Sequence, residues 1–84
     1  MEACRVYVHI DLLDLVPVRG GQRNLVMSFI RSLAQAPHTP GDYTDLDESQ
    51  RTRQIAIVGR YAITYWADDP VKAAMVVDVR PADK

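Results

Sequence analysis

The residues around Gly59 and Arg60 constrain the fold more than any other part of the chain. Two runs rich in β-branched and aromatic side chains, residues 53–58 and 61–66, are separated only by this dipeptide. A two-residue loop with glycine first is typical of a type II′ β-hairpin, because glycine readily adopts the positive φ that the turn requires. The sequence therefore predicts a tight antiparallel hairpin at this point.

Strand patterns also occur at both ends of the chain. Residues 5–10 alternate apolar side chains with Tyr7 and His9, which is the period of a half-buried strand. Residues 42–48 carry four acidic side chains and predict a short, exposed, extended segment, and residues 72–79 predict the last strand. Simple alternation divides that last strand into two faces: Met75, Val77 and Val79 on one side, and Ala74, Val76 and Asp78 on the other.

One helix is predicted over residues 22–36, and Pro37 and Pro40 end it. A brief helical turn is predicted for residues 12–16, before Pro17. Apolar side chains of the longer helix recur at the spacings of one helical face: Leu25, Val26, Phe29, Ile30, Leu33 and Ala34. We expect part of this stripe to pack against the hairpin, with Leu25, Phe29 and Leu33 meeting Ile55, Ile57, Ile63 and Tyr65.

These elements predict an α+β fold in a single domain over residues 1–84. A small curved antiparallel sheet, made of the first strand and the C-terminal meander, is covered on one face by one or two helices. Because the first strand is remote in sequence from the meander, it should pair with one edge of it. At 84 residues, of which 48% are apolar, the chain has room for one modest core.

Composition excludes several classes of protein. No apolar run approaches the roughly 18 residues of a membrane-spanning helix, and the lone Cys4 fits a reducing compartment, so we expect a cytoplasmic protein. Two histidines and one cysteine lack the spacing of a metal site, and no glycine-rich loop follows a strand as in nucleotide-binding proteins. Neither a metal nor a cofactor is expected.

Arginine dominates the positive charge of a chain that is nearly neutral overall. Ten basic and eleven acidic side chains give a net charge of −1, and eight of the ten are arginine, which suits planar contacts with phosphate or carboxylate. Four of these arginines bracket the last strands and are our candidates for binding nucleic acid or another target: Arg51, Arg53, Arg60 and Arg80.

Two interpretations of these arginines remain open. Some of them can gather on the sheet face that the helix leaves uncovered, where Tyr7, His9 and Trp66 offer rings for base stacking. Alternatively, Arg51 and Arg53 pair with the acids of residues 42–48, and Trp66 packs partly into the core. The neighbouring acids at positions 45 and 47 and at 68 and 69 fall in predicted turns, where aspartate commonly bonds to the local backbone rather than serving acid–base chemistry.

The hairpin contains a distinctive run, Ile57-Val58-Gly59-Arg60-Tyr61-Ala62-Ile63-Thr64-Tyr65, and an acidic turn and a final apolar strand follow it. This arrangement resembles the RelE/ParE toxin superfamily, small bacterial proteins of type II toxin–antitoxin and plasmid-stabilisation modules. The resemblance covers about residues 24–80, where a helix, a Pro-Gly break, an arginine-bearing strand, the Gly-Arg-Tyr hairpin and the last strand come in the family's order. It implies the family's α+β fold and a cognate antitoxin protein as partner.

Within this superfamily the sequence looks closer to ParE-like members, which poison DNA gyrase, than to RelE-like members, which cut messenger RNA on the ribosome. Ala62 stands where RelE-like enzymes carry an arginine, Gln54 and Ala56 stand at the positions of their strand lysines, and no tyrosine or histidine follows Val79. The resemblance therefore implies a toxin that binds a macromolecular target, with gyrase or the ribosome and its message as candidates.

Two alternatives to such a binding toxin remain. The first is a ribosome-dependent endoribonuclease with a non-standard catalytic set, in which Arg53, Arg60 and Arg80 stabilise the phosphorane charge and His9 or a carboxylate transfers protons. The second is a catalytically silent binding module of the same fold. We rank the binding toxin above both alternatives, because the residues of a RelE-type ribonuclease are largely absent.

Overall fold

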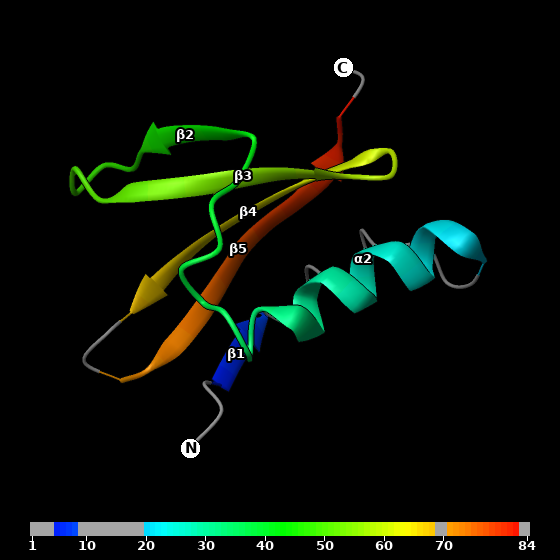
Figure 1. The fold of residues 1–84 in the computed structure, drawn as a ribbon. Coiled ribbons are helices and arrows are strands. Elements are labelled where there is room, and N and C mark those ends of the chain that lie inside the picture. The colour runs from blue at the N-terminus through cyan, green and yellow to red at the C-terminus, as the bar shows by residue number, and fades with distance from the viewer. Residues whose placement is uncertain (1–4, 9–19, 69–70, 83–84) are drawn as a thin grey trace.

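The computed structural model describes residues 5–8, 20–68 and 71–82 (Figure 1). The predicted helical turn at residues 12–16 and the side chain of His9 lie outside them. The described elements follow in chain order: β1 (Arg5–Val8), α2 (Gly21–Ser32), β2 (Tyr43–Leu46), β3 (Thr52–Val58), β4 (Tyr61–Asp68) and β5 (Ala73–Pro81). They make a small α+β domain, and within the described ranges no helix has the length and apolar character needed to cross a membrane.

The five strands form one sheet in the order β1-β5-β4-β3-β2. Strands β2 to β5 are an antiparallel meander, and β1 pairs with the edge strand β5, as expected for a first strand remote in sequence. That pairing is parallel, from Arg5 opposite Ala73 to Val8 opposite Val76, so the prediction of a wholly antiparallel sheet was wrong. Side-chain alternation is the same in both kinds of sheet and carries no information on strand direction.

The predicted hairpin is present at the junction of β3 and β4. Val58 pairs with Tyr61, and Gly59 has a φ of +60° while Arg60 keeps a negative φ, as a type II′ turn requires. The Oε1 atom of Gln22 accepts a hydrogen bond from the backbone N–H of Arg60 at 2.9 Å, and a side chain at Gly59 would overlap that oxygen. This hydrogen bond connects the hairpin to the first turn of α2.

Helix α2 covers one face of the sheet, and the core lies between them (Figure 1). The helix ends at Ser32, earlier than the predicted residue 36, and the next three backbone N–H groups bond to carbonyls three residues back in tighter turns. Leu33 is fully buried as predicted, but Leu25 is 48% exposed. The buried core comprises Val26, Ile30, Leu33, Ala56, Ile63, Tyr65, Ala74, Val76 and Val79.

The isoleucines of β3 lie on the opposite face from the one predicted. Ala56 is buried under the helix, whereas Ile57 is 40% exposed and Ile55 is half-buried on the other side of the sheet. Because side chains alternate, one choice of register fixes the face of every residue in a strand. We call the side towards α2 the covered face and the opposite side the open face.

A β-bulge in β5 overturns the predicted division of the last strand. Thr64 pairs with Asp78 but Tyr65 pairs with Val76, so Val77 is an additional residue that breaks the alternation. Val77 and Asp78 consequently both lie on the open face, while Val76 and Val79 are buried. Strand β5 also continues to Pro81, so Arg80, predicted to leave the strand, lies within it.

The link from α2 to β2 is held against the sheet by polar contacts. The Tyr65 hydroxyl donates to the carbonyl oxygen of Thr39 at 2.8 Å, and the N–H of Gly41 donates to Oε1 of Gln54 at 2.9 Å. A Cβ atom at Gly41 would lie 2.6 Å from the carbonyl oxygen of Ile55, so only glycine fits this approach. These contacts place the start of β2 beside β3.

Removing the hydroxyl in Tyr65→Phe should lower the free energy of unfolding by about 1 kcal/mol, because the bond to Thr39 is lost. Burial, with a smaller contribution from Asp42, raises the pKa of Tyr65 above its ordinary value of 10.0. A pKa higher in the folded than in the unfolded state means that stability is retained below pH 10.0 and lost as the pH rises beyond it. Urea denaturation at several alkaline pH values should show this extra loss in the wild type only, and equal alkaline losses in both proteins would contradict it.

Candidate open-face site

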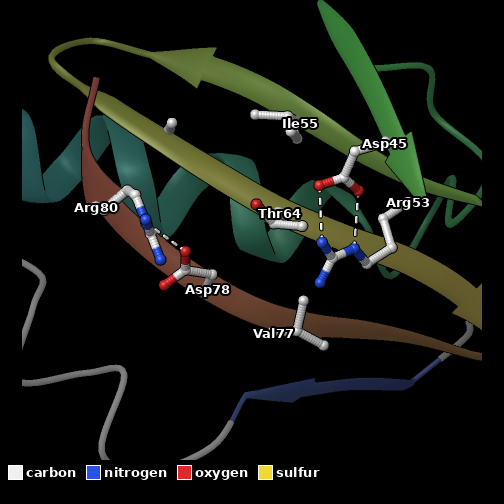
Figure 2. Close-up of a pocket in the computed structure, with 8 residues that line it drawn as sticks. Asp45, Arg53, Ile55, Thr64, Val77, Asp78 and Arg80 are labelled. Carbon is white, nitrogen blue, oxygen red and sulfur yellow. Dashed lines mark hydrogen bonds and ion pairs between the residues drawn. The ribbon is translucent and has the colours of Figure 1, made fainter. Parts of the chain in front are cut away.

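The open face carries a cavity of about 470 Å³ whose walls come from β2, β3, β4 and β5. Figure 2 shows α2 behind the sheet and the cavity side chains on the near side, with one arginine–aspartate pair at each end and Thr64 between them. The lining residues are Asp45, Arg53, Ile55, Ala62, Thr64, Val77, Asp78 and Arg80. The cavity therefore combines a largely apolar floor with charged groups at its two ends.

One end of the cavity is a two-bond contact between Arg53 and Asp45. The Nε and Nη2 atoms of Arg53 donate to the two carboxylate oxygens at 2.8 and 2.7 Å. The residues are direct cross-strand neighbours on β3 and β2, so the strand register itself brings them together. The bond to Asp45 is the main reason that the pKa of Arg53 is raised, and the charges of Asp45, Asp47 and Asp78 add to it.

The other end is a contact between Arg80 and Asp78 within β5. The Nε atom of Arg80 donates to a carboxylate oxygen of Asp78, two residues earlier on the same face of the strand. The Arg80 side chain is 70% exposed and forms the outer rim of the site. With two guanidiniums and two carboxylates, the cavity carries no excess charge.

Arg51 lies beside the cavity on the same face. Its guanidinium lies over the indole of Trp66, 3.9 Å from the ring centroid, and its Nη1 atom donates to Asp47 at 3.1 Å. The other carboxylate oxygen of Asp47 accepts the N–H groups of Arg51 and Ser49 at 2.9 and 2.8 Å. Chiefly the N–H of Arg51 lowers the pKa of Asp47. The turn between β2 and β3 is built around this carboxylate.

The structure brings together three of the four arginines singled out from the sequence. Arg53 and Arg80 line the cavity, and Arg51 adjoins it, each with a carboxylate partner. The pairing of Arg51 and Arg53 with the acids of residues 42–48 is therefore present, as one of the two interpretations expected. Arg60 is elsewhere: it lies in the hairpin turn, its N–H bonded to Gln22 and its carbonyl oxygen to the N–H of Ala82.

Sequence reasoning missed Asp78 and Thr64 as parts of the site. The spacing of Asp78 and Arg80, two residues apart in a strand, was a usable signal for a pair on one face, but the bulge at Val77 concealed which face that is. Gln54 and Ala56, compared above with catalytic lysine positions, lie on the covered face, where Ala56 is buried. Neither of these two residues contributes to the site.

The lining of this cavity suits recognition better than proton transfer. A general acid and base work best when they exchange protons near the operating pH, a property of imidazole. The titratable side chains of the lining are two aspartates and two arginines, and His38 lies in the turns after α2 instead. Within the described ranges, no three His, Cys, Asp or Glu side chains are grouped so that they could hold a metal ion.

Comparisons of the chain with protein-family models and with curated proteins find no match in either set.

Proposed function

We propose that this protein is the toxin component of a type II toxin–antitoxin module of the RelE/ParE kind. It acts in the cytoplasm by binding a macromolecular target, and a cognate antitoxin neutralises it. The observation that carries the proposal is the open face: a broad sheet surface that no helix of the described residues covers, with a charge-neutral cavity on it. The order of helix, Pro-Gly break, arginine-bearing strand, Gly-Arg-Tyr hairpin and last strand supports the family assignment.

Exposed apolar side chains on the open face favour a protein as the bound macromolecule. Ile57 is 40% and Val77 38% exposed, and the face also carries Tyr7 and Tyr43, which lie opposite other open-face residues in the sheet register. Apolar side chains gathered on one surface are typical of protein-interaction sites. Nucleic acid, in contrast, is bound largely through unpaired positive charge, and Arg51, Arg53 and Arg80 have carboxylate partners. A protein target of the gyrase type therefore ranks above the ribosome and its message.

A RelE-type endoribonuclease is the second candidate, because Arg53 and Arg80 reach the same cavity from two strands. Two guanidiniums at one site are suited to stabilising the charge of a phosphorane. This version further requires a proton donor and acceptor, which His9 or a carboxylate would have to supply. A catalytically silent module would use the same face for binding alone.

Growth on inducible expression tests the proposal. Expression of the chain alone should arrest growth of a bacterial host, and co-expression of the short open reading frame beside its gene should restore growth and copurify with it. Unimpaired growth at high soluble expression would count against a toxin. Inhibition of gyrase supercoiling by the purified protein then identifies a protein target, whereas cleavage of translated messages mapped by primer extension identifies the ribonuclease.

A further inference from the structure

We propose that Asp45 and Asp78 act as internal phosphate mimics that close the open face to nucleic acid. This mimicry does not depend on whether the protein is a toxin. The open face holds the residue types of a single-stranded nucleic-acid site, yet the arginines and the indole in and beside the cavity are engaged within the chain.

The components of such a site are guanidiniums for phosphate and an aromatic ring for a base. Arg53 and Arg80 line one cavity, and Arg51 and Trp66 adjoin it on the same face. Phosphate would use the same planar fork of nitrogens that a carboxylate uses, because both acceptors offer two oxygens at matching separation. A base would use the face of the indole.

The Nε and Nη2 atoms of Arg53 already donate to the two carboxylate oxygens of Asp45, at 2.8 and 2.7 Å. The Nε atom of Arg80 likewise donates to Asp78. The guanidinium of Arg51 covers one face of the Trp66 ring at 3.9 Å. The fork of Arg53, the Nε atom of Arg80 and one face of the Trp66 indole are therefore already occupied by groups of the same chain.

The internal carboxylates have an advantage that a free ligand lacks. Asp45 is held opposite Arg53 by strand register, and Asp78 is held two residues from Arg80 in one strand. Tethered groups act at effective concentrations of about millimolar or more, so an oligonucleotide at micromolar concentration competes poorly. The negative charges that remain also repel the phosphate backbone.

The test replaces both carboxylates in Asp45→Asn/Asp78→Asn, which keeps side-chain size and removes charge. Binding of a fluorescein-labelled single-stranded RNA of twelve nucleotides is followed by anisotropy at low salt. We expect affinity to rise by about tenfold or more over the wild type, and to fall with salt at a logarithmic slope of about −1.4, as two freed phosphate contacts require. Adding Arg53→Gln should remove most of the gain.

Glu48→Gln/Asp68→Asn is the matched control, because it also removes two negative charges. Among the described residues, neither Glu48 nor Asp68 has an ion pair to an arginine. This control should gain less than about threefold, the part due to net charge alone. An equal gain in both double variants, or wild-type binding as tight as that of Asp45→Asn/Asp78→Asn, would overturn the proposal. If the double variant fails to fold by circular dichroism, Asp78→Asn alone, which frees the exposed Arg80, must still gain affinity with a slope of about −0.7, and no gain there refutes the mimicry.

Discussion

Leu33→Ala should lower the free energy of unfolding by about 3 kcal/mol, a large part of the stability of a domain this small. Leu33 is fully buried where α2 ends, and it belongs to the core between the helix and the sheet. Shortening it to alanine removes apolar contacts and leaves a cavity that the surrounding strands close only in part. Urea denaturation followed by far-ultraviolet circular dichroism measures the change.

Leu25→Ala is the matched control, because it makes the same chemical change within α2, whereas Leu33 directly follows the last residue of that helix. Leu25 is 48% exposed, so its truncation should cost less than about 1 kcal/mol. The sequence pattern treats the two leucines alike, and equal losses would mean that the observed packing of α2 is wrong. A large loss for Leu33 alone supports the helix orientation on which the open face depends.

The parts of the fold that the sequence predicts are those with local causes. The hairpin depends on the positive φ of Gly59, and the helix depends on apolar spacing and on the prolines after it. Both could be predicted because the relevant residues are neighbours in the chain. The first strand was placed at an edge correctly because an isolated strand has few other partners.

What could not be predicted depends on contacts between distant segments. Alternation in β3 is equally regular whichever face meets the helix, and apolarity favoured Ile55 and Ile57 over the smaller Ala56, which is the residue buried in the core. The bulge at Val77 arises from pairing with β4 and has no signature within β5 itself. A single additional residue there decides that Asp78 reaches the open face.

In the candidate site, too, some features could be predicted from the sequence and others could not. Arginines were recognised as its components from their residue type, and their concentration around the last strands was visible in the sequence. That Arg53 meets Asp45 was one of two open interpretations, because only the register of β2 against β3 selects it. Net charge near zero is thus repeated at the scale of the site, because the three arginines in and beside the cavity each have their own carboxylate. Arg5, on the same face in β1, is hydrogen-bonded to the Tyr7 hydroxyl instead.

Ala62→Trp should abolish the growth arrest expected of the wild type. Ala62 lies on the cavity floor in β4, directly opposite Arg80 in the sheet register. An indole at this position fills much of the roughly 470 Å³ cavity, and tryptophan is well accepted in strands whose face meets solvent. An indole that fills this cavity should cost on the order of 100-fold in affinity, enough to lose a target that is bound at micromolar strength.

Ser28→Trp provides the comparison, because Ser28 is exposed on α2, which lies on the covered side of the sheet. This variant should arrest growth as the wild type does, at matched soluble expression and with an unchanged circular dichroism spectrum. Arrest by a folded Ala62→Trp protein would place the target contact away from the open face. Loss of arrest in both folded variants would contradict a specific role of the open face. An indole on the far side of the molecule would then have the same effect as one in the cavity.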